Sequence, residues 1–163
     1  MMKQTLINPM KDLIFDSKVR EMCRSCKRYG KKATCPPYIE SVEYYQKLLA
    51  KYKNGILFFK IYPIDDEIPY EKLSKDSSLE MSGKILSERN KLFSEGHYFI
   101  LGLGAGSCKL CDECSFPCRM PADSLIPLEA TGINVVDMLN KFKIKIKFPI
   151  KENFYRVGAL FYD

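Results

Sequence analysis

Four of the seven cysteines in this chain fall within eleven residues, in the stretch GAGSCKLCDECSFPCRMP over residues 104–121. They are Cys108, Cys111, Cys114 and Cys118, and glycines and prolines surround them. Four cysteines at these short intervals seldom arise from packing alone, because free cysteines are usually buried singly as small hydrophobic side chains. The stretch therefore predicts a loop that folds around an inorganic group.

The rest of the chain suggests a reducing environment for these thiols. No apolar run is long enough to cross a bilayer, and the N-terminal residues MMKQTLINPMKDLIF lack the apolar stretch of a signal peptide. We therefore expect a cytoplasmic protein with no membrane partner. Clustered thiols in that compartment more often bind metal or carry out redox chemistry than form disulfides.

The length of 163 residues and the apolar content of 46% predict one folded domain over residues 1–163. Residues 1–38 are expected to be an irregular, basic segment that carries cysteines, and residues 39–163 an α/β core. The net charge of +6 permits an anionic partner without requiring one.

Hydrophobic periodicity sets the expected fold class. A strand over 56–62, a helix that begins near Ser77 with a capping-box pattern and ends at Gly96, and a strand over 98–104 form a βαβ unit with a parallel crossover. We expect an α/β fold with a small mixed sheet, helices packed on it and cysteine-rich metal-binding loops. The other expected elements are a helix from Ser41, a helix over 135–142 that Asn134 caps, an edge strand over 143–148 and a last strand over 156–163.

The spacing of the clustered cysteines, C-x2-C-x2-C-x3-C, is the ligand run of bacterial ferredoxins, in which the fourth cysteine serves a second cluster. Here Cys118 is followed by Arg-Met-Pro and not directly by proline. Gly104 and Gly106 come just before the loop, where glycines let the backbone approach a cofactor and point N–H groups at its sulfides. A dinucleotide turn at these glycines is the less favoured interpretation, because a cysteine loop and not a helix follows.

A second set of cysteines lies in CRSCKRYGKKATCPPY, where Cys23, Cys26 and Cys35 give C-x2-C-x8-C. This pattern suits zinc or an iron–sulfur cluster, since the surrounding stretch is too basic for its thiols to be ordinary core residues. The nearby lysines and arginines, including Arg20, can offset thiolate charge or form a solvated face. Nucleic-acid binding is a weaker alternative, because no RRM-, KH- or zinc-finger-like pattern is present.

Both cysteine motifs, with PCRMP and LEATGINVVDML, resemble a prokaryotic family of unknown function whose members are described as predicted metal-binding proteins. The resemblance runs from about residue 18 to 163. It implies cysteine-bound metal at the seven cysteines and no established reaction. It also implies a cysteine in many relatives where this chain has Thr131, and eight cysteines would suffice for two four-iron clusters.

The seven thiolates can be assigned to metal centres in three ways. Two clusters can form, with one iron bound to another ligand or left open as a substrate site. One cluster can use one motif while the remaining thiols stay free. Zinc can take four cysteines tetrahedrally. We favour iron–sulfur, 4Fe-4S in particular, because the triple spacing suits a cube better than a tetrahedron.

The expected function is therefore electron transfer, or redox or cluster assistance to a protein partner. The alternatives are a zinc-stabilised binding module and an enzyme that uses an open cluster iron. Histidine chemistry has one candidate at most, His97, which is expected to be a polar residue at the start of a strand. The carboxylate pair Asp65–Asp66 is expected to lie in a solvated loop. Arg119 is expected to cover the cysteine loop.

Overall fold

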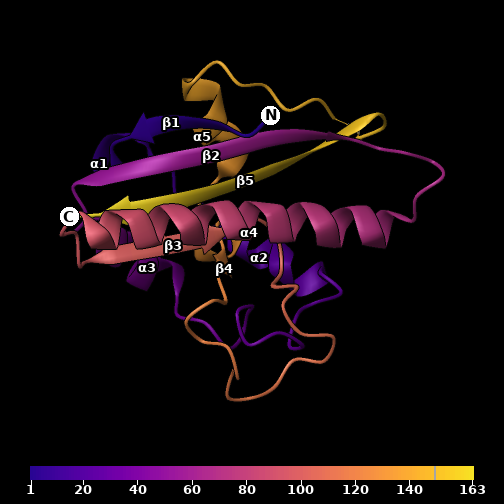
Figure 1. The fold of residues 1–163 in the computed structure, drawn as a ribbon, viewed down its shortest axis with the longest axis horizontal. Helices are drawn as coiled ribbons and strands as arrows, with labels where there is room; N and C mark the ends of the chain where they lie inside the picture. The colour runs from indigo at the N-terminus through magenta and orange to yellow at the C-terminus, as the bar shows by residue number, and fades with distance from the viewer. Residues whose placement is uncertain (149) are drawn as a thin grey trace.

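The structure, a computed structural model, describes residues 1–148 and 150–163, and in these residues the strands form one five-stranded sheet in the order β1-β2-β5-β3-β4 (Figure 1). All neighbouring strands are antiparallel except β3 and β4, which are parallel. The strands are β1 (Lys3–Ile7), β2 (Asn54–Pro63), β3 (Ile100–Gly104), β4 (Ile126–Pro127) and β5 (Asn153–Tyr162). The helices are α1 (Pro9–Asp12), α2 (Ser17–Met22), η1 (Cys23–Ser25), α3 (Val42–Leu49), α4 (Tyr70–Ser94), η2 (Glu129–Thr131) and α5 (Val135–Lys141).

The predicted mixed sheet and its parallel βαβ unit are confirmed, with one difference in strand order. β2 and β3 run in the same direction because each is antiparallel to β5, and α4 connects them. β5 lies between the two strands and pairs with β2 over ten residues. Its residues 157–161 are buried on both faces of the sheet, which suits a central strand.

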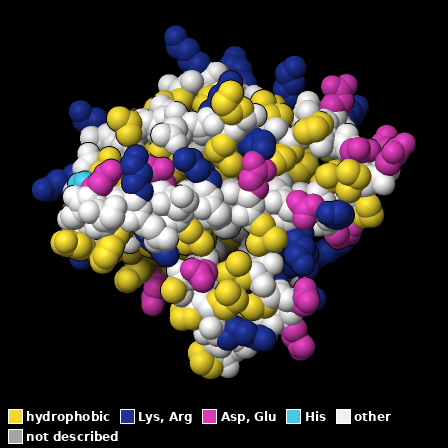
Figure 2. Space-filling view, viewed as in Figure 1, with side chains coloured by type: hydrophobic (Ala, Val, Ile, Leu, Met, Phe, Trp, Pro, Cys, Tyr) yellow, Lys and Arg dark blue, Asp and Glu magenta, His cyan; other side chains and the backbone are white. Residues whose placement is uncertain are grey.

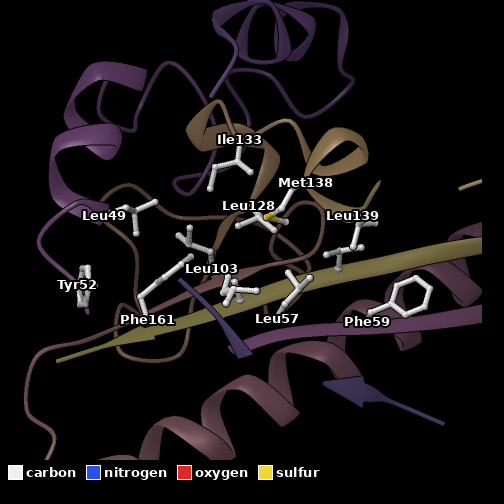
Figure 3. Packing of buried hydrophobic residues seen from close by; sticks show 13 residues of the cluster. Leu49, Tyr52, Leu57, Phe59, Leu103, Leu128, Ile133, Met138, Leu139 and Phe161 are labelled. Atoms are coloured by element: carbon white, nitrogen blue, oxygen red, sulfur yellow. The ribbon is translucent and has the colours of Figure 1, made fainter. Parts of the chain in front are cut away.

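The sheet has a hydrophobic core on each face. Leu57 and Phe59 of β2 point to the face covered by α3, η2 and α5, and Ile56 and Phe58 point to the face covered by α4. Figure 3 shows the first of these cores, where Leu57 and Leu103 from the sheet lie against residues that include Leu128 and Met138. Figure 1 shows α4 lying across the opposite face.

Two predictions about the edges of the sheet are wrong. Residues 3–7, expected to be irregular, form the edge strand β1, which pairs with β2 from Lys3 to Ile7. Residues 143–148, expected to be the edge strand, contain no strand, and the last strand β5 pairs with β2 and β3. In the KIKIKF segment the lysines are exposed and the isoleucines are half-buried against the core. An alternating sequence can therefore arise in a loop that packs on the core as well as in a strand.

The helix caps were predicted correctly at two of three sites. Ser41 Oγ accepts a hydrogen bond from the N–H of Tyr44 at 3.1 Å. Asn134 Oδ1 accepts one from the N–H of Asp137, also at 3.1 Å. The capping box at Ser77 is wrong, because α4 begins at Tyr70 and Ser77 lies buried inside the helix.

Replacement by alanine should change the stability of the fold in opposite directions at Gly83 of α4 and Gly158 of β5. Gly83 is exposed on α4, and a Cβ there would meet nothing within 4 Å, so Gly83→Ala should stabilise the fold by about 0.5–1 kcal/mol through helix propensity. A Cβ at Gly158 of β5 would lie 2.6 Å from Cδ1 of Ile85. Gly158→Ala should therefore destabilise it. Urea unfolding of both variants tests this, and a loss of stability in Gly83→Ala would contradict the packing described for α4.

Within the described residues, no helix combines the length and the apolar character needed to span a bilayer.

Candidate metal centre

The cysteine loop connects the two parallel strands at one end of the sheet. It leaves β3 after Gly104 and returns at β4, so the parallel pairing of β3 and β4 sets its two ends. The N–H of Leu128 donates to the carbonyl oxygen of Gly104 at 2.8 Å, and Ser78 Oγ of α4 donates to the carbonyl oxygen of Ala105 at 3.1 Å. In Figure 1 the loop hangs below the sheet beside the segment that follows α2.

Arg20 of α2 holds the N-terminal cysteine segment against the core. One guanidinium nitrogen donates to the carbonyl oxygen of Ala130 in η2, and another donates to that of Glu40, each at 2.8 Å. These contacts join the two ends of the segment 23–39 to η2. Arg20 therefore has a structural role in addition to the charge-offsetting role considered from the sequence, since its cation also lowers the pKa of Cys23 and partly opposes the effect of burial.

The two cysteine segments contact each other directly. The N–H of Ala33 donates to Sγ of Cys114 at 3.3 Å. The rings of Tyr38 and Phe116 lie 4.6 Å apart between centroids. Segments separated by about eighty residues in the sequence thus meet at the tip of the cysteine loop.

Cys108, Cys111, Cys114 and Cys118 all line one cavity, and residues 32–34 of the N-terminal segment form part of its wall. The volume of the cavity is about 20 Å³, which is room for about one water molecule. All four cysteines of the loop, including Cys118, therefore lie around one cavity.

Polar groups that can bond to a metal–sulfur group also lie at this cavity. The N–H of Met120 donates to Sγ of Cys118 at 3.4 Å, as the N–H of Ala33 does to Cys114. The hydroxyl of Thr34, which lines the cavity, is buried and has no hydrogen-bond partner of good geometry within the described residues, although it lies close enough to the thiol of Cys35 to oppose in part the rise that burial causes in the pKa of that thiol. Leaving such a hydroxyl unpaired is unfavourable, so the cavity wall has a donor available for a bound group.

Cys23, Cys26 and Cys35 form a second group near the first. Cys23 and Cys26 lie around η1, and Cys35 is 7% exposed. Burial raises the pKa of Cys35 to about 11, and the other two thiols contribute a smaller like-charge effect. Burial is also the main cause that raises the pKa of Cys23, followed by the carboxylate of Glu129 in η2. The seven cysteines are thus divided into four and three.

The thiol of Cys108 is also harder to ionise than an exposed cysteine. Burial raises its pKa, and the nearby Lys32 cation partly opposes that rise. Metals bind thiolates, so a metal that binds here must displace protons from these thiols.

The donor set fits a thiophilic metal or a metal–sulfur cluster. Four cysteines line one cavity, backbone N–H groups donate to the sulfurs of two of them, and basic side chains lie beside them. In the described part of the chain, no three Cys, His, Asp or Glu side chains have the arrangement that a single metal ion needs.

The glycines before the loop have packing roles. A Cβ at Gly104 would lie 3.1 Å from Cβ of Leu125. Gly106 has φ +70°, and a Cβ there would lie 2.9 Å from a guanidinium nitrogen of Arg156. Neither glycine is among the described residues that line the cavity, and a role of either in binding a cofactor stays a prediction.

The other sequence candidates lie elsewhere or have local roles. His97 pairs with Asp163 at 3.4 Å near the start of β3, whereas the cysteine loop follows the end of that strand. Arg119 donates to the carbonyl oxygen of Glu113 at 2.8 Å and to Ser115 Oγ at 3.3 Å, so it braces the cysteine loop from within. Asp65 accepts the N–H of Glu67 at 2.9 Å in a turn.

Sequence reasoning missed the contribution of residues 32–34 to the cavity wall and the approach of Glu129 to Cys23. Ala33 and Thr34 stand immediately before Cys35 in CRSCKRYGKKATCPPY, and their position next to a candidate ligand was the available signal. No sequence signal pointed to Glu129, since its approach depends on how η2 packs against α2.

Comparison with known proteins gives one family match. The model of a family described as Predicted metal-binding protein (DUF2284) matches residues 7–162. No curated protein matches the chain. No solved structure matches it either.

Proposed function

This chain belongs to the DUF2284 family of predicted metal-binding proteins, and from that premise we propose that it carries an iron–sulfur cluster on Cys108, Cys111, Cys114 and Cys118. The cluster would serve electron transfer, or redox or cluster assistance to a protein partner in the cytoplasm. One observation carries the proposal: the four thiols of a ferredoxin-like ligand run line the same cavity.

The residues around this centre would have two roles, binding of the group and stabilisation of its negative charge. The four thiolates hold the group, and the N–H groups of Ala33 and Met120 stabilise negative charge on the sulfurs of Cys114 and Cys118. When bound, an iron–sulfur cluster accepts and donates single electrons.

Cys118 departs from the ferredoxin arrangement. In that arrangement the fourth cysteine serves another cluster, but here Cys118 lines the same cavity as Cys108, Cys111 and Cys114. We propose that a second, separate centre forms on Cys23, Cys26 and Cys35. Three thiolates leave one coordination position for another ligand, as at a cluster with an open iron.

Zinc is the second candidate, and the small size of the cavity favours it over a cluster. A cluster requires the loop around Cys108–Cys118 to move outward, whereas a single ion requires the thiols to move closer together, because no three of them in the described residues have a metal-binding arrangement. That loop contains no regular helix or strand in the described residues, so its backbone can rearrange without breaking secondary structure.

Purification without oxygen, followed by iron, zinc and acid-labile sulfide analysis, tests the proposal. We expect brown protein with broad absorption near about 400 nm, typical of iron–sulfur centres, and close to four irons for each occupied cube. Colourless protein with one zinc per chain, unfolded by chelation, would replace the cluster with a structural zinc site. Oxygen-protected protein that contains no transition metal would refute both.

A further inference from the structure

A basic hollow lies next to the four-cysteine cavity. Its volume is about 320 Å³, within the range of small-molecule pockets. Tyr70 and Glu71 at the start of α4 form one side, and the two cysteine segments form the other. The basic residues that line it are Arg28, Lys32, Lys75 and Lys109, and Figure 2 shows Lys and Arg side chains gathered below the right-hand part of α4.

The hollow carries an excess of positive charge. Four basic and two acidic side chains line it, and one acidic residue, Asp112, pairs with Lys75 at 3.5 Å. Within residues 1–148 and 150–163, Arg28, Lys32 and Lys109 form no ion pair. Lys109 is half-buried, and its ammonium group bonds to the hydroxyl of Ser107 at 2.9 Å. A half-buried cation without a carboxylate partner is unfavourable unless an anion approaches it.

The hollow and the cysteine cavity share part of their walls. Cys111 and Lys32 line both. The start of α4 adds further positive potential, since Pro69 provides no side-chain cap for the N–H groups of the first turn. Ser74 and Tyr70 supply hydroxyl groups to the same wall.

We propose that this hollow binds a small molecule that carries a phosphate or carboxylate group, and that it holds this molecule beside Cys111. The adjacency to a metal centre depends on the function proposed above, whereas the binding of the anion does not. The lining supplies a guanidinium group, ammonium groups and hydroxyl groups, which are the donors that recognise such oxyanions.

The alternative role for these cations is to offset thiolate charge at the neighbouring cavity. That role accounts for Lys32 near Cys108. It does not account for Lys75, which extends from α4 and pairs with Asp112, because its side chain lines the hollow and not the cavity. Lys75 is therefore the residue that separates the two roles.

Calorimetric titration of the metal-loaded protein with inorganic pyrophosphate and, separately, citrate tests the proposal at low ionic strength. The two probes distinguish phosphate from carboxylate recognition. We expect Lys75→Gln and Arg28→Gln each to weaken binding of the preferred probe by about threefold or more, and Asp112→Asn to strengthen it by about twofold, as for partly exposed charges.

The matched control is Lys72→Gln. Lys72 lies on the same helix and pairs with Asp76 at 2.6 Å with a similar exposure, but it does not line the hollow. Its replacement should leave the affinity unchanged. If neither probe binds, or if Lys72→Gln weakens binding as much as Lys75→Gln, the site does not exist and any attraction is a general effect of net charge.

Metal content measured on the same samples keeps the two proposals separate. Lys75→Gln and wild-type protein should contain equal amounts of metal. Wild-type protein that contains no metal after oxygen-protected purification, but still binds pyrophosphate at the hollow, would refute the metal centre and retain the anion site. Protein that contains its full amount of metal but binds neither probe would refute the anion site and retain the metal centre.

Discussion

Replacing Cys114 with alanine should empty the four-cysteine cavity of metal. Cys114 lies where the two cysteine segments meet, since its sulfur accepts the N–H of Ala33 at 3.3 Å. Loss of an outer partner of a metal ligand alone lowers affinity about 10–100-fold, so loss of the ligand itself should exceed that range. The measurement is metal and sulfide per chain after anaerobic purification, together with a competition assay against a chelator.

Ser115→Ala is the matched control for this variant. Ser115 is the next residue and also lines the cavity, but its hydroxyl bonds to the carbonyl oxygen of Pro117 at 3.0 Å and to the guanidinium group of Arg119 at 3.3 Å, not to a cysteine sulfur, and Arg119 keeps its bond to the carbonyl oxygen of Glu113 in the variant. It should keep wild-type metal content. Equal loss in both variants would mean that any disturbance of the loop releases metal, and full retention in Cys114→Ala would remove Cys114 from the ligand set.

Leu57→Ala should strongly destabilise the fold and leave the cysteine segments untouched. Leu57 is 0% exposed in the central part of the sheet, where it packs in a cluster with Leu103, Leu128 and Phe161 (Figure 3). Truncation of a buried leucine to alanine leaves a cavity and costs about 2–5 kcal/mol. That loss is large against a typical total of about 5–15 kcal/mol. Urea unfolding measures it.

Leu6→Ala provides the same chemical change on the neighbouring strand. Leu6 lies in β1, one residue from the partner of Leu57, and is 74% exposed. Its truncation should change the free energy of unfolding by about 0.5 kcal/mol or less. If the two variants lost similar stability, the burial assigned to β2 would be wrong.

Much of the fold could be predicted because it depends on local patterns. The apolar runs at 56–62 and 98–104 predicted β2 and β3, and side-chain caps predicted the starts of α3 and α5. Residues 3–7 could not be recognised as a strand, because β1 is a mostly exposed edge whose partner lies some fifty residues away. The start of α4 at Tyr70 was missed because the contact that explains Ser77 also comes from a distant part of the sequence. Ser77 has the spacing of a cap, yet its hydroxyl bonds inside the helix and to Arg156 of β5.

The candidate site divides in the same way. Cysteine spacing predicted the two motifs, since ligands from one short loop must be close in sequence to reach one group. The division into four and three depended on the loop conformation, which brings Cys118 to the cavity of its three neighbours. The basic hollow could not be predicted, because its four cations lie on three segments that only folding brings together, namely Arg28 with Lys32, Lys75, and Lys109.

The sequence by itself determined the chemical character of this protein, namely seven thiols in two closely spaced sets on an α/β framework. Spacing along the chain is enough for that, because each set lies within one short segment. Only the tertiary structure decided which residues of one segment form the wall around the thiols of the other, and which charges lie beside them. Those contacts depend on the way that the sheet and Arg20 hold two distant segments at one end of the molecule.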